Sequence, residues 1–201
     1  VAFVNKMDRM GANFEKVLAE LKRKLKASAV AVQLPIGAAE TFSGVIDLVK
    51  MCAYRFSEED MGSRVEQVEI PSELAAKAEE ARAHLIEMVA DVDETLLEAY
   101  MENSDVSENL IKEAIRRATI SNQLVPVLAG SSLKNKGVQP LLDAVTDYLP
   151  SPLDIQAVRG LVPKTDADMQ REASDFESLT GLVFKMATDK FIGKLAFVRV
   201  Y

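Results

Sequence analysis

The fold prediction depends on one stretch, Val1-Ala2-Phe3-Val4-Asn5-Lys6-Met7-Asp8. Its first four residues are apolar and partly β-branched, which is typical of a short parallel strand buried on both faces. A polar loop follows this strand. Asn13 then precedes apolar residues at helical spacing, which predicts a capped amphipathic helix. Open α/β sheets bind ligands at the carboxyl ends of their strands, so the polar loop is a candidate binding site.

A second unit of the same kind begins near residue 124. The apolar run Leu124-Val125-Pro126-Val127-Leu128-Ala129 predicts another buried strand. A polar loop over residues 130–137 connects it to a helix predicted over residues 138–149. Both loops follow strands of the parallel type, so we expect Ser131, Ser132 and Leu133 to complete the site that residues 5–8 begin.

The pattern Asn-Lys-x-Asp suits recognition of guanine. The carboxylate of Asp8 can accept hydrogen bonds from N1–H and the 2-amino group of guanine, two donors that adenine lacks. Lys6 can lay its methylene stem on a face of the base. Asn5 can contact the other edge of the base or connect the two loops, and Met7 is expected to face away. An alternative without a ligand treats Asn5 and Asp8 as ordinary turn formers after a strand.

The second loop would complete the pocket. Guanine O6 is an acceptor, and backbone N–H groups around Ser131 and Ser132 can donate to it. Leu133 would shape the floor of the pocket.

In the segment between these units, the spacing of apolar residues changes from helical to strand-like. Short strands predicted at 30–34, 41–49, 53–56 and 64–70 indicate a small antiparallel sheet. Helices are predicted from Ser72, taken as an N-cap, to residue 92, then over residues 94–101 and 107–121. Beyond the Pro150-Ser151-Pro152 stop, residues 153–179 are polar and are expected to form an extended linker. Two strands are predicted at 181–187 and 194–201.

Composition excludes several classes of function. The net charge of −7 over 201 residues argues against a broad phosphate-binding face, so DNA is not an expected partner. A single cysteine and a single histidine cannot form a Cys/His zinc site or an internal disulfide. No apolar run approaches the roughly 20 residues that cross a bilayer, so no membrane partner is expected. We expect a cytoplasmic monomer.

Several stretches together resemble bacterial elongation factor G, a translational GTPase. They are residues 1–14, 33–37, 42–49, 134–139, 147–152 and 184–189. The resemblance extends over essentially the whole chain. It implies an α/β fold: the C-terminal part of a P-loop GTPase domain with an inserted α+β subdomain, followed by the first strands of a β-barrel domain.

The resemblance also implies domain boundaries and site roles. Residues 1–26 and 123–152 would belong to the GTPase domain, 27–122 to the inserted subdomain, 153–179 to a linker and 180–201 to the barrel. Asn5, Lys6, Met7 and Asp8 would form the fourth GTPase motif. Ser131, Ser132 and Leu133 would form the fifth, in which Ser132 replaces the usual alanine.

Other GTPase motifs are absent from the sequence. It contains no Gly-x-x-x-x-Gly-Lys-Ser/Thr, and its one Asp-x-x-Gly, Asp8-Arg9-Met10-Gly11, overlaps the Asn-Lys-x-Asp loop and is not taken as a separate switch motif. The chain also begins and ends inside apolar, strand-like runs, so we expect it to be an internal fragment. GTP or GDP would be its ligand. The Mg²⁺ ligands and the catalytic residues would lie outside it, so the isolated chain is expected to be inactive.

Charged residues also repeat along the helix after Pro71, at Glu73, Lys77, Glu80, His84, Glu87 and Asp91. Such a stripe is either a solvated face or a docking face for a basic partner. The resemblance implies the ribosome as a partner, both its rRNA and its proteins, with the ribosomal stalk protein on Glu80, Glu87 and Asp91.

Three alternatives remain open. The chain could come from a paralogue that recycles ribosomes, or from a ribosome-protection GTPase of the tetracycline-resistance type. It could also act as a non-catalytic module in which the insertion folds alone and binds the stalk protein.

Overall fold

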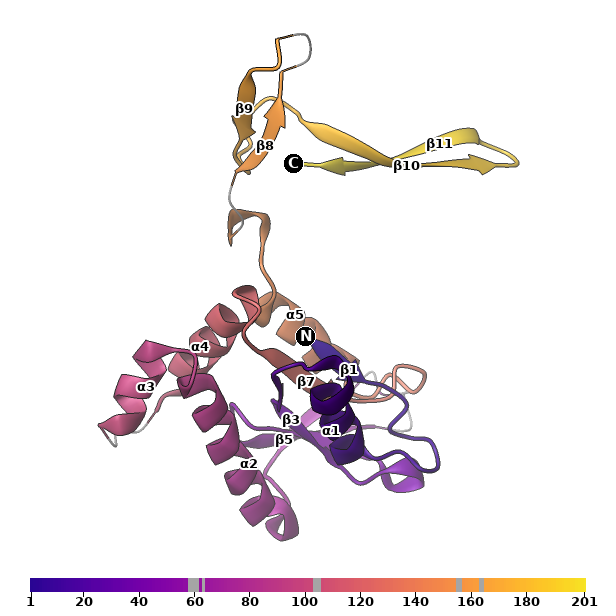
Figure 1. The fold of residues 1–201 in the computed structure, drawn as a ribbon. Helices are drawn as coiled ribbons and strands as arrows, with labels where there is room; N and C mark the ends of the chain where they lie inside the picture. Colours follow the sequence, from indigo (N-terminus) through magenta and orange to yellow (C-terminus); the bar gives the residue numbers. More distant parts are fainter. Residues whose placement is uncertain (58–61, 63, 103–105, 155–156, 163–164) are drawn as a thin grey trace. The chain divides into compact units, whose positions relative to one another are not determined.

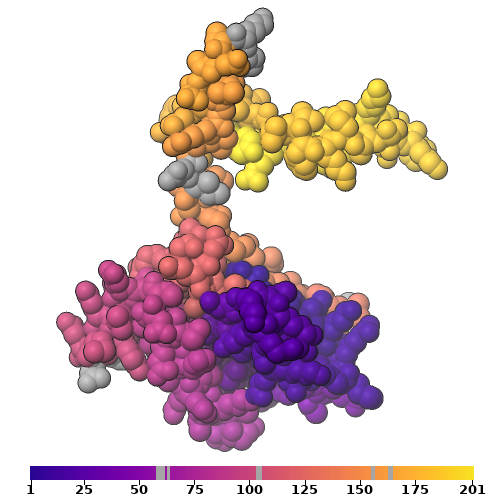
Figure 2. Space-filling model, in the orientation of Figure 1, coloured from indigo at the N-terminus to yellow at the C-terminus, as the bar shows by residue number. Residues whose placement is uncertain are grey.

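The computed structural model describes residues 1–57, 62, 64–102, 106–154, 157–162 and 165–201. These form two units, Val1–Leu149 and Pro150–Tyr201, each of which is described by itself (Figure 1). In the space-filling view, the first unit forms one continuous body from the indigo N-terminal segment to the magenta helices (Figure 2).

A three-stranded parallel sheet underlies the first unit (Figure 1). Its order is β1 (Ala2–Val4), β7 (Val125–Ala129) and β2 (Ala29–Ala31), so β7 is the central strand. Helix α1 (Phe14–Leu25) follows β1 and helix α5 (Val138–Tyr148) follows β7. Asn13 caps α1 as predicted, because its side chain accepts a hydrogen bond from the Lys16 N–H at 2.8 Å. Both strand–loop–helix units predicted from the sequence are confirmed.

The strand predicted at 30–34 is wrong as a single element. Its first part, β2, joins the parallel sheet, and its last part begins strand β3 (Gln33–Ile36) of a second sheet. Val32 lies at the crossover: its N–H donates to Val127 O at 3.1 Å, while its carbonyl accepts from the Leu48 N–H at 3.0 Å. The insertion therefore leaves the parallel sheet only after β2.

The second sheet is antiparallel, as predicted, with the order β3, β4 (Gly44–Asp47), β5 (Cys52–Phe56) and β6 (Val65–Val68). A short 3-10 helix, η1 (Ala39–Thr41), occupies the start of the strand predicted at 41–49, which shortens that strand. Gly37 begins this turn with φ +77°, where an added Cβ would lie 2.1 Å from Thr41 O. Only glycine fits this position without strain.

Three helices complete the unit: α2 (Ser72–Ala90), α3 (Glu94–Met101) and α4 (Glu108–Ile120). The prediction that Ser72 caps α2 is wrong, since Pro71 occupies the cap position and Ser72 is already helical. Asp93 and Ser107 do cap α3 and α4, accepting hydrogen bonds from the N–H groups of Leu96 and Leu110.

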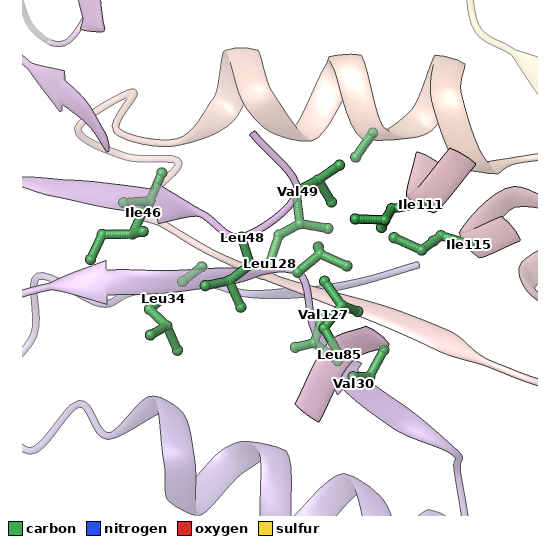
Figure 3. Close-up of a cluster of buried hydrophobic side chains, with 14 of the residues drawn as sticks. Val30, Leu34, Ile46, Leu48, Val49, Leu85, Ile111, Ile115, Val127 and Leu128 are labelled. Atoms are coloured by element: carbon green, nitrogen blue, oxygen red, sulfur yellow. The ribbon is translucent and has the colours of Figure 1, made fainter. Parts of the chain in front are cut away.

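One hydrophobic core connects all these elements (Figure 3). It contains side chains from the parallel sheet, the antiparallel sheet, α2 and α4, among them Val30, Leu34, Ile46, Leu85, Ile111, Ile115, Val127 and Leu128. The insertion shares this core with the parallel sheet, and its described residues form no separate core of their own. This argues against the alternative in which the insertion folds alone.

The second unit contains η2 (Pro152–Asp154) and two antiparallel hairpins. The first hairpin, β8 (Val158–Leu161) with β9 (Asp168–Arg171), lies inside the segment predicted to be an extended linker, so that prediction is wrong for these residues. The strands are polar and short, which hides them from a search for apolar alternation. The second hairpin, β10 (Gly181–Asp189) with β11 (Gly193–Val200), confirms the two predicted strands.

Candidate guanine-recognition site

The first polar loop leaves the sheet at the carboxyl end of β1. Lys6 has φ +64°, and its backbone N–H donates to Oδ1 of the preceding Asn5 at 2.8 Å. The Met7 N–H donates to Gly130 O at 3.0 Å, which holds the loop beside the end of β7. The Met7 side chain is only 1% exposed and belongs to the core. It therefore faces away from any ligand, and the loop contributes Asn5, Lys6 and Asp8 to the surface.

Asn5 connects the two loops across 127 positions of the sequence. Its Oδ1 accepts from the Ser132 N–H at 3.0 Å, and its Nδ2 donates to the Ser132 hydroxyl at 2.8 Å. Two roles were considered for Asn5, contact with the base and connection of the two loops. The structure shows the connection of the loops. Ser131, Ser132 and Leu133 thus lie beside residues 5–8, as the order of the strands predicted.

The second loop is closed by backbone hydrogen bonds. The Ser131 N–H donates to Lys136 O at 2.8 Å, and the Lys136 N–H donates back to Ser131 O at 2.9 Å. Gly137, with φ +84°, then turns the chain into α5.

These bonds correct one expectation about guanine O6. The Ser131 N–H is already used inside the loop, so it is not a free donor. The Ser132 N–H is shared with exposed Asn5, and the Leu133 N–H forms no hydrogen bond within the described part of the chain. Because the Ser132 N–H is also engaged, by Asn5 Oδ1, donation to O6 from this loop stays a prediction. The Leu133 side chain is 86% exposed, and its role in shaping the pocket stays a prediction.

Asp8 has the charge that the recognition chemistry requires. Its pKa is lowered, first by the nearby Ser131 hydroxyl and also by the charges of Lys134 and Arg9. The Ser131 hydroxyl is buried and directed at this carboxylate, although the pair does not reach the geometry of a regular hydrogen bond. Asp8 is therefore ionised at neutral pH and can accept two hydrogen bonds from one base edge.

The acidic residues predicted on α2 are exposed, but they lie apart from the loops. Glu80, Glu87 and Asp91 all face solvent, and Asp91 is the residue that ends the helix. Lys77, in the same stripe, forms an ion pair with Glu15 of α1. This ion pair joins Lys77 to an acidic residue outside the stripe.

Two basic residues that contact this framework were missed by sequence reasoning. Lys136 is only 3% exposed, and its ammonium group donates to Phe42 O at 3.0 Å. Arg82 of α2 donates to Leu48 O at 2.7 Å and to Val49 O at 2.6 Å. Lys136 lies in one of the stretches that carry the family resemblance, but neither its neighbours nor those of Arg82 indicate the acceptors, which only the tertiary fold brings near.

Comparison with known families agrees with this geometry. The model of the elongation factor Tu GTP binding domain matches residues 1–151. The chain belongs to this family. A crystal structure of a protein from Thermus thermophilus is similar over 98% of the chain, with a TM-score of 0.75 and 25% sequence identity. The chain covers 26% of the length of that Thermus protein.

The match places the chain in the translational GTPase family, with a mixed α/β fold. The described helices include none with the length and apolar character needed to span a bilayer. The described residues also include no cluster of three or more His, Cys, Asp or Glu side chains arranged to hold a metal ion.

Proposed function

We propose that this chain is the base-recognising part of a translational GTPase of the elongation factor G type, which hydrolyses GTP on the ribosome to drive translocation. The observation that carries the proposal is the Asn5–Ser132 connection, which brings ionised Asp8 beside the second loop. The resemblance over residues 1–14, 42–49 and 134–139 supports the specific type.

The chemistry of the site favours guanine over adenine. Asp8 accepts from N1–H and the 2-amino group, the Lys6 stem covers a face of the base, and the second loop donates to O6. An adenine base would leave the Asp8 carboxylate without these donors, and sites of this kind discriminate strongly.

We also propose that the chain needs a phosphate-binding segment and a Mg²⁺ site supplied elsewhere in a longer protein. The sequence lacks the phosphate-loop motif, and its one Asp-x-x-Gly, at residues 8–11, overlaps the Asn-Lys-x-Asp loop, so the 201-residue chain alone is expected to bind GTP weakly and not to hydrolyse it. Titration calorimetry with the isolated chain measures this, and tight GTP binding would refute it.

An exchange of base preference tests guanine recognition directly. In the complete GTPase that contains this chain, Asp8→Asn should lower GDP affinity by about a hundredfold. The same variant should gain affinity for xanthosine diphosphate, because the new amide can donate to the 2-oxo group of xanthine while still accepting from N1–H. Equilibrium binding of both nucleotides to both proteins gives the result. Unchanged preference for GDP would remove Asp8 from the site.

The acidic face of α2 supports a second part of the proposal, docking of a basic ribosomal protein such as the stalk protein. Glu80, Glu87 and Asp91 are exposed along one helix, and Lys77 is drawn away to Glu15. Complementary charge on a partner would speed the encounter, an effect that salt weakens.

A further inference from the structure

Lys136 is buried although lysine rarely is. Its side chain lies in the loop between β7 and α5, is 3% exposed, and reaches Phe42 O with its ammonium group at 3.0 Å. Phe42 itself is 1% exposed and lies between η1 and β4 of the insertion. Burying an ammonium group is costly, and an apolar residue of similar size would serve stability as well or better. The hydrogen bond to Phe42 O offsets part of this cost and fixes the side chain to the insertion.

The same residue also closes the second base-recognition loop. The backbone of Lys136 exchanges two hydrogen bonds with Ser131, at 2.8 and 2.9 Å. Ser131 is directly followed by Ser132, whose N–H lies at the Asn5 connection. Lys136 thus connects the loop that carries the O6 donors to the insertion through a single side chain.

The first loop is attached to the same part of the insertion. The Ala39 N–H of η1 donates to Met7 O at 2.8 Å, three positions before Phe42. The segment itself is internally tied, because the Ala38 N–H donates to Thr41 Oγ1 at 3.1 Å and the Thr41 N–H donates to Ala38 O at 3.1 Å. Residues 38–42, here called the brace, therefore contact both base-recognition loops.

We propose that Lys136 is a positioning residue for guanine recognition: its ammonium group fixes the second loop to the brace, so that the backbone donors of that loop meet guanine O6 at a set distance from Asp8. The inference rests on the proposed guanine recognition. It concerns the placement of the donors and not contact of Lys136 with the base.

The test uses Lys136→Met, which keeps the length of the stem and removes the ammonium group. Lys24→Met is the matched control, since Lys24 is an exposed lysine of α1 that pairs with Glu20 on the same helix. In the complete GTPase, Lys136→Met should weaken GDP binding about fivefold to tenfold, because a hydrogen bond from a charged donor no longer orders the loop.

A change of nucleotide separates positioning from general destabilisation. In 6-thio-GDP, sulfur replaces O6 and is a poor acceptor, while N1–H and the 2-amino group remain. Lys136→Met should therefore weaken binding of 6-thio-GDP much less than binding of GDP. Backbone hydrogen exchange in the 201-residue chain gives a readout without nucleotide: exchange over residues 130–137 should accelerate about tenfold in Lys136→Met and stay unchanged in Lys24→Met.

The other possible outcomes contradict either the inference about Lys136 or the proposed function. Equal losses for GDP and 6-thio-GDP, together with a lower midpoint of thermal unfolding, would make Lys136 a purely structural residue. GDP affinity and loop exchange that are both unchanged would also overturn the inference. If the unaltered protein does not prefer GDP to ADP, the proposed function itself fails and takes the inference with it, whereas a preference that survives Lys136→Met undiminished overturns the inference alone.

Discussion

Asn5 and Ser132 make three hydrogen-bond contacts: the Ser132 N–H lies 3.0 Å from Asn5 Oδ1, and the Ser132 hydroxyl lies 2.8 Å from Nδ2 and 3.1 Å from Oδ1. Substitutions can separate the contributions of the serine N–H and the serine hydroxyl. Asn5→Ala removes all three contacts, while Ser132→Ala removes only the two of the hydroxyl and leaves the N–H donor in place. Comparison of the two variants therefore tests which hydrogen bond holds the loops together.

We expect Asn5→Ala to weaken GDP binding by the complete GTPase about tenfold or more, since the side chain that connects the loops is lost. Ser132→Ala should stay within about threefold of the unaltered protein, because the backbone bond persists. Competition against a fluorescent GDP analogue measures both. Similar losses of GDP affinity in the two variants would show that the Ser132 hydroxyl, and not its backbone N–H, makes the main contribution to holding the loops together.

Gly37→Ala should destabilise the first unit strongly. Its added Cβ would lie 2.1 Å from Thr41 O at a residue with φ +77°, so η1 must move. Gly11→Ala is the matched control, because Gly11 has φ +81° but nothing within 4 Å of the added Cβ. We expect a loss of about 1 kcal/mol in the free energy of unfolding for Gly11→Ala and about 3 kcal/mol for Gly37→Ala. Urea unfolding gives both values, and equal losses would contradict the clash.

Asp47→Asn should stabilise the chain at neutral pH. Burial raises the pKa of Asp47, so the folded state binds a proton more tightly than the unfolded state. The associated stability is present below the unfolded pKa of about 3.9 and is lost as the pH rises through the folded pKa. Asparagine removes the charge and keeps the oxygen that accepts from the Val49 and Lys50 N–H groups. We expect a gain of about 1 kcal/mol at pH 7 that shrinks at pH 4; a loss at pH 7 would contradict it.

Asp93→Asn should destabilise the chain at neutral pH, which is the opposite of the effect expected for Asp47→Asn. Hydrogen bonds from Arg117 at 2.7 and 3.0 Å lower the pKa of Asp93, which also caps α3. The resulting stability is present above the unfolded pKa of about 3.9 and is lost as the pH falls through the lower folded pKa. Because Arg117 is half exposed, we expect a loss of only about 1–2 kcal/mol at pH 7. Unfolding measured between pH 2 and 7 should show the loss fading at the acidic end, and a loss independent of pH would exclude the ion pair as its cause.

Reversing Glu87 and Asp91 to lysine tests the acidic face of α2. Ribosome-dependent GTP turnover by the complete GTPase should slow, while GDP affinity should not change, since α2 lies apart from both loops. Reversal of exposed Glu69 and Glu172, which lie outside the stripe, is the control. Turnover equal to that of the control would leave the stripe as a solvated face.

The sequence was sufficient to predict the parts of this fold that depend on local pattern. The apolar runs before Asn5 and Ser131 predicted two parallel strands, which pair in the structure, whereas the chemistry of the loops after them stays a prediction. Asn13 precedes a regular apolar stripe, so local capping preference alone was enough to place the start of α1.

The errors arise where distant contacts override local pattern. Val32 divides one apolar run between two sheets because it bonds to Val127 on one side and Leu48 on the other. No local signal indicates those acceptors. The same reason hides Lys136, whose acceptor Phe42 lies 94 positions away in the sequence. Ser72 suits a cap by its residue type, but Pro71 occupies the cap position and Ser72 is already the first helical residue.

The hydrophobic core in Figure 3 limits how this insertion can be engineered. Three residues of the insertion are buried in one cluster with two residues of the parallel sheet: Leu34, Ile46 and Ile115 with Val127 and Leu128. Each set therefore shields the other from solvent. Residues 32–121 therefore cannot be transplanted into another protein as a cassette, nor deleted and replaced by a short loop, without exposing apolar surface in both pieces. A shortened version would need polar replacements at these core positions, designed on both sides of the cut together.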